Sequence, residues 1–149
     1  MSEIFVDADA CPVKAEITRV AERHGVVTHF VSNSGFRPHA NPLIRNVVVS
    51  DKFDAADDWI VERVKSGDIV ITADIQLADR CLKAGAAVIG MTGKPFTENS
   101  IGTALAMREL SSQLRDMGEI KGGGPAFSPA DRSRFSNALE VAVQKAKRA

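Results

Sequence analysis

Aspartates at the ends of apolar segments are the residues of this chain best suited to chemistry. Asp7 and Asp9 follow an apolar run at residues 3–7, and their spacing of two in an extended backbone directs both carboxylates to the same side. Asp74 ends the string ITAD, after a second apolar run. A third group of acids lies in the string DKFDAADDWIV and comprises Asp51, Asp54, Asp57 and Asp58.

Asp57 interrupts the apolar face of the helix predicted at residues 53–67. At about 100° per residue, the apolar residues of this face lie within about 20° of Phe53, and Asp57 lies about 40° from it. Asp54, at roughly 100°, is near the edge of the face, and Asp58, at roughly 140°, belongs to the solvent side. An acid on a buried face is either paired with an internal base or acts as a ligand. We favour the ligand interpretation for Asp57.

The elements that must position these acids alternate between strands and helices. Strands are predicted at 3–7, 26–32, 44–50, 68–74 and 86–92. Helices are predicted at about 12–25, 53–67, 75–85, 97–117 and from Ser128 onward, where serine is the cap and Pro129 the first helical residue. Because near-continuous apolar strands indicate a parallel sheet covered on both faces, we expect one three-layer α/β/α domain over residues 1–149. Residues from about 97 to 149 would form a helical extension of it.

The acids are expected to meet at one edge of this sheet. Ligands of open parallel α/β sheets bind outside the carboxyl ends of the strands, so Asp7, Asp9, Asp57 and Asp74 should converge on one concave site. A carboxylate at the edge of a core costs several kcal/mol unless it is paired or bound to a cation, which makes Asp7 the strongest candidate. For Asp74, a role as a simple helix cap is equally compatible with its position.

A ligand set made only of carboxylates suits Mg²⁺ or Mn²⁺ rather than zinc. The candidate ligands are Asp7, Asp9, Asp54, Asp57 and Asp74, and all of them except Asp54 are candidate catalytic residues. Such ions orient an attacking water and offset charge on a phosphodiester. The three histidines show no metal-ligand spacing such as HExxH.

Cationic side chains near the same edge are candidate phosphate contacts. They are Arg37 and His39 in the loop NSGFRPHANP, and Lys14 at the start of the first helix, because an arginine fork matches phosphate oxygens. An ordinary polar loop explains the string equally well. Cys11 adjoins the acids, but it has no identifiable partner base that would make it a nucleophile.

Composition places the chain among globular proteins. It has 149 residues, 44% of them hydrophobic and 26% charged, and its formal net charge is zero, so the chain as a whole has no electrostatic preference for nucleic acid. No segment approaches the ~20 apolar residues of a membrane span, and no export signal is recognisable, so we expect a cytoplasmic protein without a membrane partner. Cys11 and Cys81 are then expected to be free thiols.

Four strings, VDADACPVK, DAADDWI, DIVITADIQLADRCLKAGA and GGPAFSPADRSRF, together resemble the YaiI/YqxD-like family of uncharacterised bacterial proteins, also called UPF0178 or DUF188. The resemblance covers nearly the whole chain. It implies a relation to PIN-like domains, which are metal-dependent ribonucleases, and hence a Mg²⁺ or Mn²⁺ cofactor and single-stranded RNA as a partner. By this resemblance Asp7 is the first-strand acid, Asp74 is the acid of the T-x-D string, and the helix acid is one of Asp54, Asp57 and Asp58.

The PIN-like pattern has one acid that this sequence lacks. PIN domains usually carry another acid shortly after the next strand, where this chain has the string MTGK at residues 91–94. Asp79 and Glu98 are distant from that position, and Asp9 is the nearest substitute.

Two other functions compete with a metal-dependent nuclease. The string IFVDADA also reads as the strand and D-x-D of a haloacid-dehalogenase-like phosphatase, but the paired acids at 57 and 58 precede Thr72 and Lys94, the reverse of that superfamily's order. The other alternative is a non-catalytic module that binds RNA or protein through the acidic pocket. The sequence does not indicate an oligomeric state.

Overall fold

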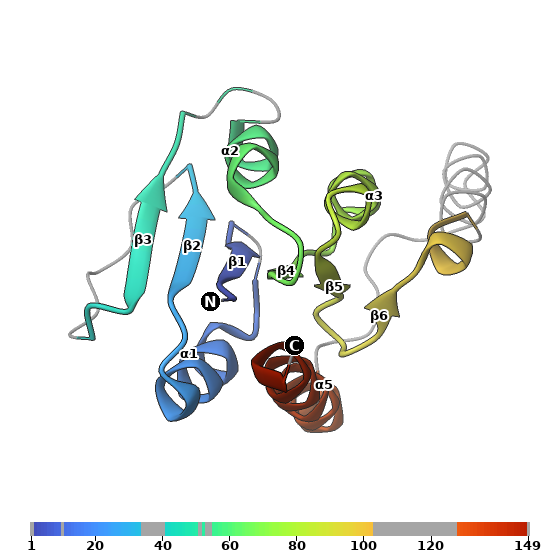
Figure 1. Cartoon of the computed structure of the whole chain (residues 1–149). Coiled ribbons are helices and arrows are strands. Elements are labelled where there is room, and N and C mark those ends of the chain that lie inside the picture. Colours follow the sequence, from blue (N-terminus) through green and yellow to red (C-terminus); the bar gives the residue numbers. More distant parts are fainter. Residues whose placement is uncertain are drawn as a thin grey trace, which may run out of the picture.

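The computed structural model describes residues 2–9, 11–33, 41–50, 52, 55–102 and 128–148. A six-stranded sheet with the order β3-β2-β1-β4-β5-β6 forms its centre (Figure 1). The strands are β1 (Ile4–Asp7), β2 (Thr28–Ser32), β3 (Ile44–Val48), β4 (Ile69–Ile71), β5 (Ala87–Ile89) and β6 (Pro95–Phe96). All neighbouring strands pair in parallel except β5 and β6, which are antiparallel.

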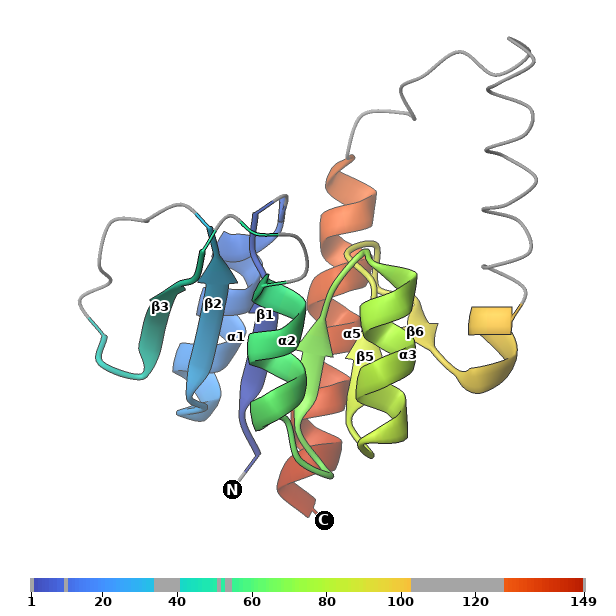
Figure 2. The same cartoon turned by 90° about the horizontal axis from the view of Figure 1, so that it is seen from above.

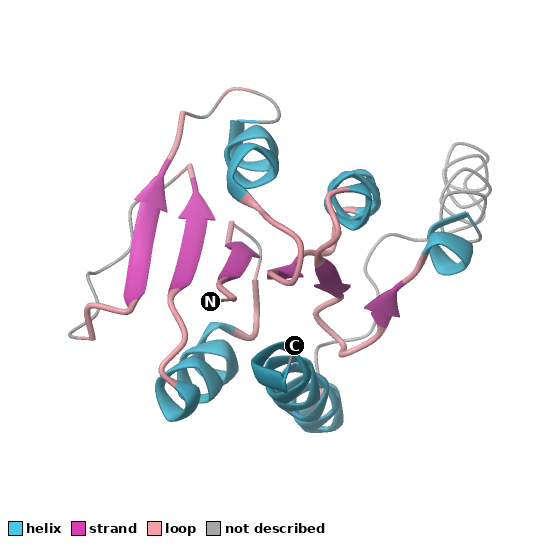
Figure 3. Ribbon diagram, viewed as in Figure 1, coloured by secondary structure: helices cyan, strands magenta, loops and turns pink. Residues whose placement is uncertain are grey.

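Helices cover both faces of the sheet. They are α1 (Lys14–His24), α2 (Ala55–Arg63), α3 (Ile75–Lys83) and α5 (Pro129–Arg148). In Figure 3, drawn in the view of Figure 1, α1 and α5 lie on one side of the strands and α2 and α3 lie on the other. The predicted three-layer α/β/α fold with a mainly parallel sheet is therefore confirmed.

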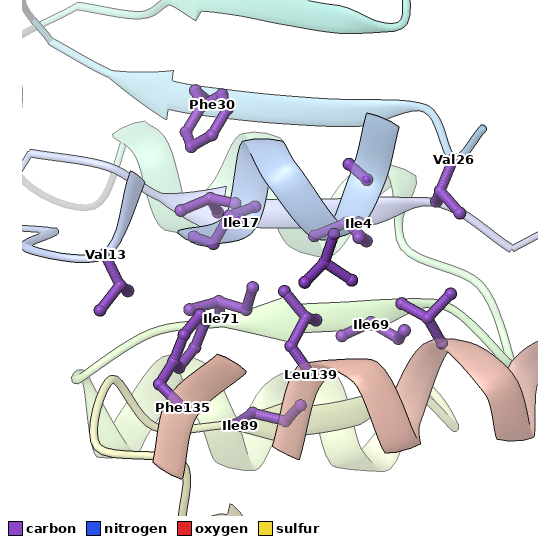
Figure 4. Close-up of a cluster of buried hydrophobic side chains, with 14 of the residues drawn as sticks. Ile4, Val13, Ile17, Val26, Phe30, Ile69, Ile71, Ile89, Phe135 and Leu139 are labelled. Atoms are coloured by element: carbon purple, nitrogen blue, oxygen red, sulfur yellow. The ribbon is translucent and has the colours of Figure 1, made fainter. Parts of the chain in front are cut away.

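The two layers of helices enclose two separate apolar clusters. Ile4 and Val6 of β1 face α1 and α5 and pack in one cluster with Phe135 and Leu139 (Figure 4). Phe5, between them in the strand, belongs to the other cluster. Successive residues of a strand point to opposite faces, so a strand buried on both faces needs an uninterrupted apolar run.

Two helix termini, the end of α1 and the start of α5, have the capping residues that the sequence predicts. α1 is closed by Gly25, whose φ of 65° is left-handed and suits glycine at this position. α5 begins after Ser128, whose Oγ accepts the backbone N–H of Asp131 at 3.1 Å, while Asp131 Oδ2 accepts the backbone N–H of Ser128 at 3.0 Å. This reciprocal pair is a capping box and confirms Ser128 as the cap.

The end of α2 differs from the prediction. The helix was expected to continue to Gly67, but it ends at Arg63. Asp68 is the reason, because its Oδ2 accepts the backbone N–H of Lys65 at 2.9 Å and holds residues 65–68 in a turn that leads into β4. Local hydrogen bonding by an aspartate side chain replaced the last helical turn.

The sequence also did not predict β6. The expected strand at 86–92 is shorter, and the chain turns at Gly90 and Gly93 before Phe96 pairs with Val88. Of the helix expected at 97–117, residues 98–102 are helical and the others lie outside the described part of the chain. α5 is a packed part of the fold, since Phe135 and Leu139 are fully buried.

Both cysteines are free thiols, as predicted. In the part of the chain that the structure describes, no helix is both long enough and apolar enough to cross a membrane.

Candidate functional site

The hydroxyl of Thr72 links two acids at the carboxyl ends of neighbouring strands. Asp7 is the last residue of β1, and Thr72 directly follows β4, which pairs with β1 in parallel. Thr72 Oγ1 donates to Asp7 Oδ2 at 3.1 Å and accepts the backbone N–H of Asp74 at 2.9 Å. Thr72 is fully buried, whereas Asp7 and Asp74 are half-buried. We call Asp7, Asp9, Thr72 and Asp74 the acidic edge.

Asp74 is fixed by the start of α3. It is the N-cap of this helix, and its Oδ1 accepts the backbone N–H groups of Gln76 at 2.8 Å and Leu77 at 3.2 Å. The cap role that the sequence left open is therefore confirmed. The cap uses only Oδ1, so it is compatible with a second role for Oδ2.

Asp9 connects the end of β1 to the end of β2. It lies two residues beyond β1, it is exposed, and both of its carboxylate oxygens accept the backbone N–H of Asn33, at 3.0 and 3.2 Å. Asn33 directly follows β2. The acidic edge thus spans the carboxyl ends of β2, β1 and β4.

The electrostatics of Asp7 show that the other two acids act on it. Burial is the largest cause that raises the pKa of Asp7 above 3.8, and the negative charges of Asp74 and then Asp9 raise it further. The hydrogen bond from Thr72 opposes this rise in pKa. Among the described residues, no lysine, arginine or histidine forms an ion pair with Asp7. The structure therefore brings Asp7, Asp9 and Asp74 together as a group with excess negative charge.

Asp57 lies on α2 beside α3, and its membership of this group stays a prediction. It is half-buried in the first turn of α2, and its charge acts on Cys81 of α3, whose pKa is raised to about 11, mainly by burial. Asp58 is exposed, as the helix geometry predicted, and its Oδ1 lies 3.1 Å from Arg80 Nη1. The periodicity identified the inward face of α2, but it could not show that α3 lies opposite Asp57.

Lys14 and Cys11 lie beside the acidic edge. The pKa of the Cys11 thiol is raised, chiefly by burial; the charge of Lys14 lowers this pKa and that of Asp7 raises it. A raised pKa leaves less thiolate, which argues against Cys11 as a nucleophile. Lys14 stays a candidate phosphate contact. Arg37, His39 and Asp54 lie outside the described residues.

Sequence reasoning missed the position of Thr72 between two acids. The signal was present, since Thr72 follows a fully apolar strand and precedes a helix cap by two residues. A buried hydroxyl at such a point needs a hydrogen-bond partner, and the last residue of the adjacent strand is the nearest candidate. Only the pairing of β4 with β1 identifies that residue as Asp7.

The donor atoms of the acidic edge are all oxygens, which suits Mg²⁺ or Mn²⁺. No three histidine, cysteine or acidic side chains within the described ranges lie close enough to enclose a metal ion by themselves. Mg²⁺ does not require such a cage, because it usually keeps several waters and binds through one or two carboxylates. Asp7 and Asp74 fit that mode of binding.

Comparison with known proteins gives a consistent family. The model of the uncharacterised YaiI/YqxD family matches residues 5–145. The chain is 60% identical over 148 residues to a UPF0178 protein of Parvibaculum lavamentivorans, covering 99% of this chain and 97% of that protein. It is 58% identical over 145 residues to a UPF0178 protein of Rhizobium meliloti, covering 97% and 99%. No solved structure matches the chain. The chain therefore belongs to the YaiI/YqxD family of UPF0178 proteins.

Proposed function

We propose that this protein is a Mg²⁺- or Mn²⁺-dependent phosphodiesterase that cleaves single-stranded RNA at the acidic edge. The observation that carries the proposal is the pair of hydrogen bonds by which Thr72 joins Asp7 to Asp74. These groups lie at the carboxyl ends of adjacent parallel strands, where α/β sheets bind their ligands. The resemblance to PIN-like domains supports the choice of RNA.

Each acid of the acidic edge is held by a neighbour that leaves it able to bind a cation. Thr72 orients Asp7, the start of α3 orients Asp74, and the backbone of Asn33 orients Asp9. Asp7 and Asp74 would hold the ion, and Asp9 would contact its water shell. When bound, the ion supplies an activated water and offsets the charge of the phosphodiester. The positions of Asp57 and Asp58 beside α3 leave these two acids out of the proposal.

The unfavourable charge of the acidic edge supports cation binding. Asp74 and Asp9 act on Asp7 at the acidic edge, and burial and repulsion both disfavour the charged form of Asp7. A divalent cation removes the repulsion and restores the charged form.

Cleavage of single-stranded RNA in Mn²⁺ and in EDTA tests this function directly. The wild type should cleave with Mn²⁺ and stop with EDTA. Asp7→Asn and Asp74→Asn should each reduce cleavage by more than about a hundredfold, because even outer-shell substitutions at metal sites cost 10–100-fold. Asp58→Asn and Asp79→Asn are matched controls, since these acids pair with Arg80 and Lys83 instead. Equal activity in all four variants would refute the assignment.

A non-catalytic RNA-binding module is the second candidate. It is favoured by residues 91–94, where this chain has MTGK in place of the further acid that PIN-like domains usually carry. Such a module would bind labelled RNA without cleaving it in Mn²⁺. A haloacid-dehalogenase-like phosphatase would instead hydrolyse small phosphate esters, so the three functions give three different results.

A further inference from the structure

A hollow of about 600 Å³ lies between the loop that joins β5 to β6 and the first turns of α5. Its polar lining residues are Thr92, Lys94, Asp131, Arg134 and Asn137. We call it the α5 hollow. Neither the acidic edge nor the sequence-predicted phosphate contacts include any of these residues.

Gly93 fixes the walls of the α5 hollow. The backbone N–H of Gly90 donates to the carbonyl of Lys94 at 2.8 Å, and that of Gly93 donates to the carbonyl of Gly90 at 2.9 Å, so the loop is a tight turn. Gly93 has a φ of 90°, and a Cβ there would lie 2.6 Å from the carbonyl oxygen of Arg134. Only glycine allows the turn to approach the α5 backbone this closely.

The α5 hollow lies at the carboxyl ends of the strands, as the acidic edge does. β5 pairs in parallel with β4, so the residues after Ile89 leave the sheet where Thr72 leaves β4. Phe135, next to Arg134, is in the same buried cluster as Ile71, the residue before Thr72 (Figure 4). Figure 2 shows α5 running along the sheet. The α5 hollow therefore lies beyond the carboxyl end of β5, the neighbour of the strand that leads to Thr72 and Asp74.

Two cations supply the charge of the α5 hollow. Lys94 is exposed and makes no ion pair within the described part of the chain. Arg134 Nη1 lies 3.1 Å from Asp131 Oδ1, and the pKa of Asp131 is lowered, chiefly by its hydrogen bonds with Ser128. Asp131 thus stays charged and pairs with Arg134, whose side chain is exposed. The guanidinium has five N–H donors, so others are left for a ligand. Asn137, three residues further along α5, lies on the same helix face as Arg134.

We propose that the α5 hollow binds a backbone phosphate of the RNA strand whose cleaved bond lies at the acidic edge. This inference rests on the proposed function. The acidic edge repels a polyanion, and the chain has zero net charge, so binding needs a local cationic site near the acids. An arginine fork and a lysine are the groups that proteins use for phosphate. Contacts of this kind position the strand without reading its sequence.

Binding of fluorescently labelled single-stranded RNA in EDTA tests the inference without any turnover. The double variant Lys94→Ala/Arg134→Ala should raise Kd by more than about tenfold. It should also make the dependence of log Kd on log salt shallower by about 0.7, the value for one lost phosphate contact on a single strand. Lys94→Arg should bind like the wild type, because it keeps the charge.

The matched control is Lys83→Ala/Arg63→Ala, which removes two exposed cations from the other face of the sheet and should leave Kd unchanged. Circular dichroism confirms that each variant is folded. Equal weakening by both double variants, or no RNA binding by the wild type, would overturn the inference. Complete displacement of the RNA by millimolar inorganic phosphate would also overturn it, since the α5 hollow would then be a site for a free anion.

The outcomes separate the two proposals. RNA binding that depends on Lys94 and Arg134, without Mn²⁺-dependent cleavage, rejects the enzyme and keeps the α5 hollow as an RNA site. Cleavage that depends on Asp7 but is equally strong in the Lys94→Ala/Arg134→Ala variant at low RNA concentration rejects the α5 hollow and keeps the enzyme.

Discussion

The two edges of the sheet carry similar acids in opposite surroundings. At the amino edge, Asp68 is 4% exposed and accepts the backbone N–H groups of Glu3 at 3.0 Å and Lys65 at 2.9 Å. Glu3 in turn lies 2.7 Å from His29 Nε2. At the carboxyl edge, Asp7 receives one hydroxyl hydrogen bond and has two other carboxylates as neighbours.

Compensation of charge, rather than burial alone, distinguishes the two edges. Glu140 also lies at the amino edge and is paired with Arg23, at 2.7 Å, and with His24. A hollow of about 1110 Å³ is found at this same edge, larger than the α5 hollow, yet the acids around it already have partners. An uncompensated charge is the better indicator of a functional site, because a folded protein retains such a charge only at a cost in stability.

The largest expected effect is at the amino edge. Asp68→Ala should lower the free energy of unfolding by about 3 kcal/mol, because two part-buried backbone N–H groups lose a buried charged acceptor worth about 1.5–3 kcal/mol per hydrogen bond. Urea unfolding measures the change. Asp79→Ala, which breaks the exposed pair with Lys83, should cost less than about 1 kcal/mol. Equal costs for the two variants would contradict the structural role of the amino edge.

Mn²⁺ should stabilise the protein through the carboxyl edge. A ligand that binds only the folded state adds about 2.7 kcal/mol at a hundredfold excess over Kd. Thermal melts with and without millimolar Mn²⁺ should show this shift in the wild type and in Asp58→Asn. Asp7→Asn and Asp74→Asn should each abolish it. A wild type that does not respond to Mn²⁺ would remove the basis for a metal site.

Asp74 offers a way to separate its two roles. Asn is as good an N-cap as Asp, so Asp74→Asn should change stability in metal-free buffer by only a few tenths of a kcal/mol. Asp74→Ala removes the acceptor of two backbone N–H groups and should cost about 1 kcal/mol. Urea unfolding of the two variants measures both effects. If Asp74→Asn is as destabilising as Asp74→Ala, the charge itself is structural and the two edges are less different than we infer.

The strands and the α/β/α layering could be predicted because the sequence patterns that indicate them are local. Continuous apolar runs such as the one at 69–71 specify burial on both faces, and that in turn specifies a parallel sheet between helices. Ser128 and Gly25 marked helix ends by residue type alone. β6 has two residues, too few to show a periodicity.

The sequence identified the candidate acids of the site, but it did not show which of them lie close together in the fold. Asp7 and Asp74 follow strands, so their place at the carboxyl edge follows from chain direction. Asp57 is on a helix, and its environment depends on which element packs opposite, which is set by the crossing of α2 and α3. The α5 hollow depends on contact between Gly93 and a helix that begins 36 residues later, at Pro129, and no local pattern encodes that contact.

The smallest effect is the dependence of the stability of Asp7→Asn on pH. Burial, with the charges of Asp74 and Asp9, raises the pKa of Asp7 in the folded protein above the value of 3.8 that applies to an unfolded chain. A raised pKa means that Asp7 contributes stability below pH 3.8 and loses this contribution as pH rises through the folded-state pKa. Asn has no such titration, and its amide oxygen still accepts the hydroxyl of Thr72.

The variant should therefore become more stable than the wild type as pH rises above 3.8, and the difference should reach a plateau once Asp7 is fully ionised. Urea unfolding in metal-free buffer from about pH 3 to about pH 7 measures it. Saturating Mn²⁺ should reverse the order at neutral pH, because only the wild type gains the ion. If the wild type instead gains stability relative to the variant as pH rises without metal, Asp7 has a cationic partner. It would then resemble Glu3 and Glu140 of the amino edge, and the acidic edge would lose its uncompensated charge.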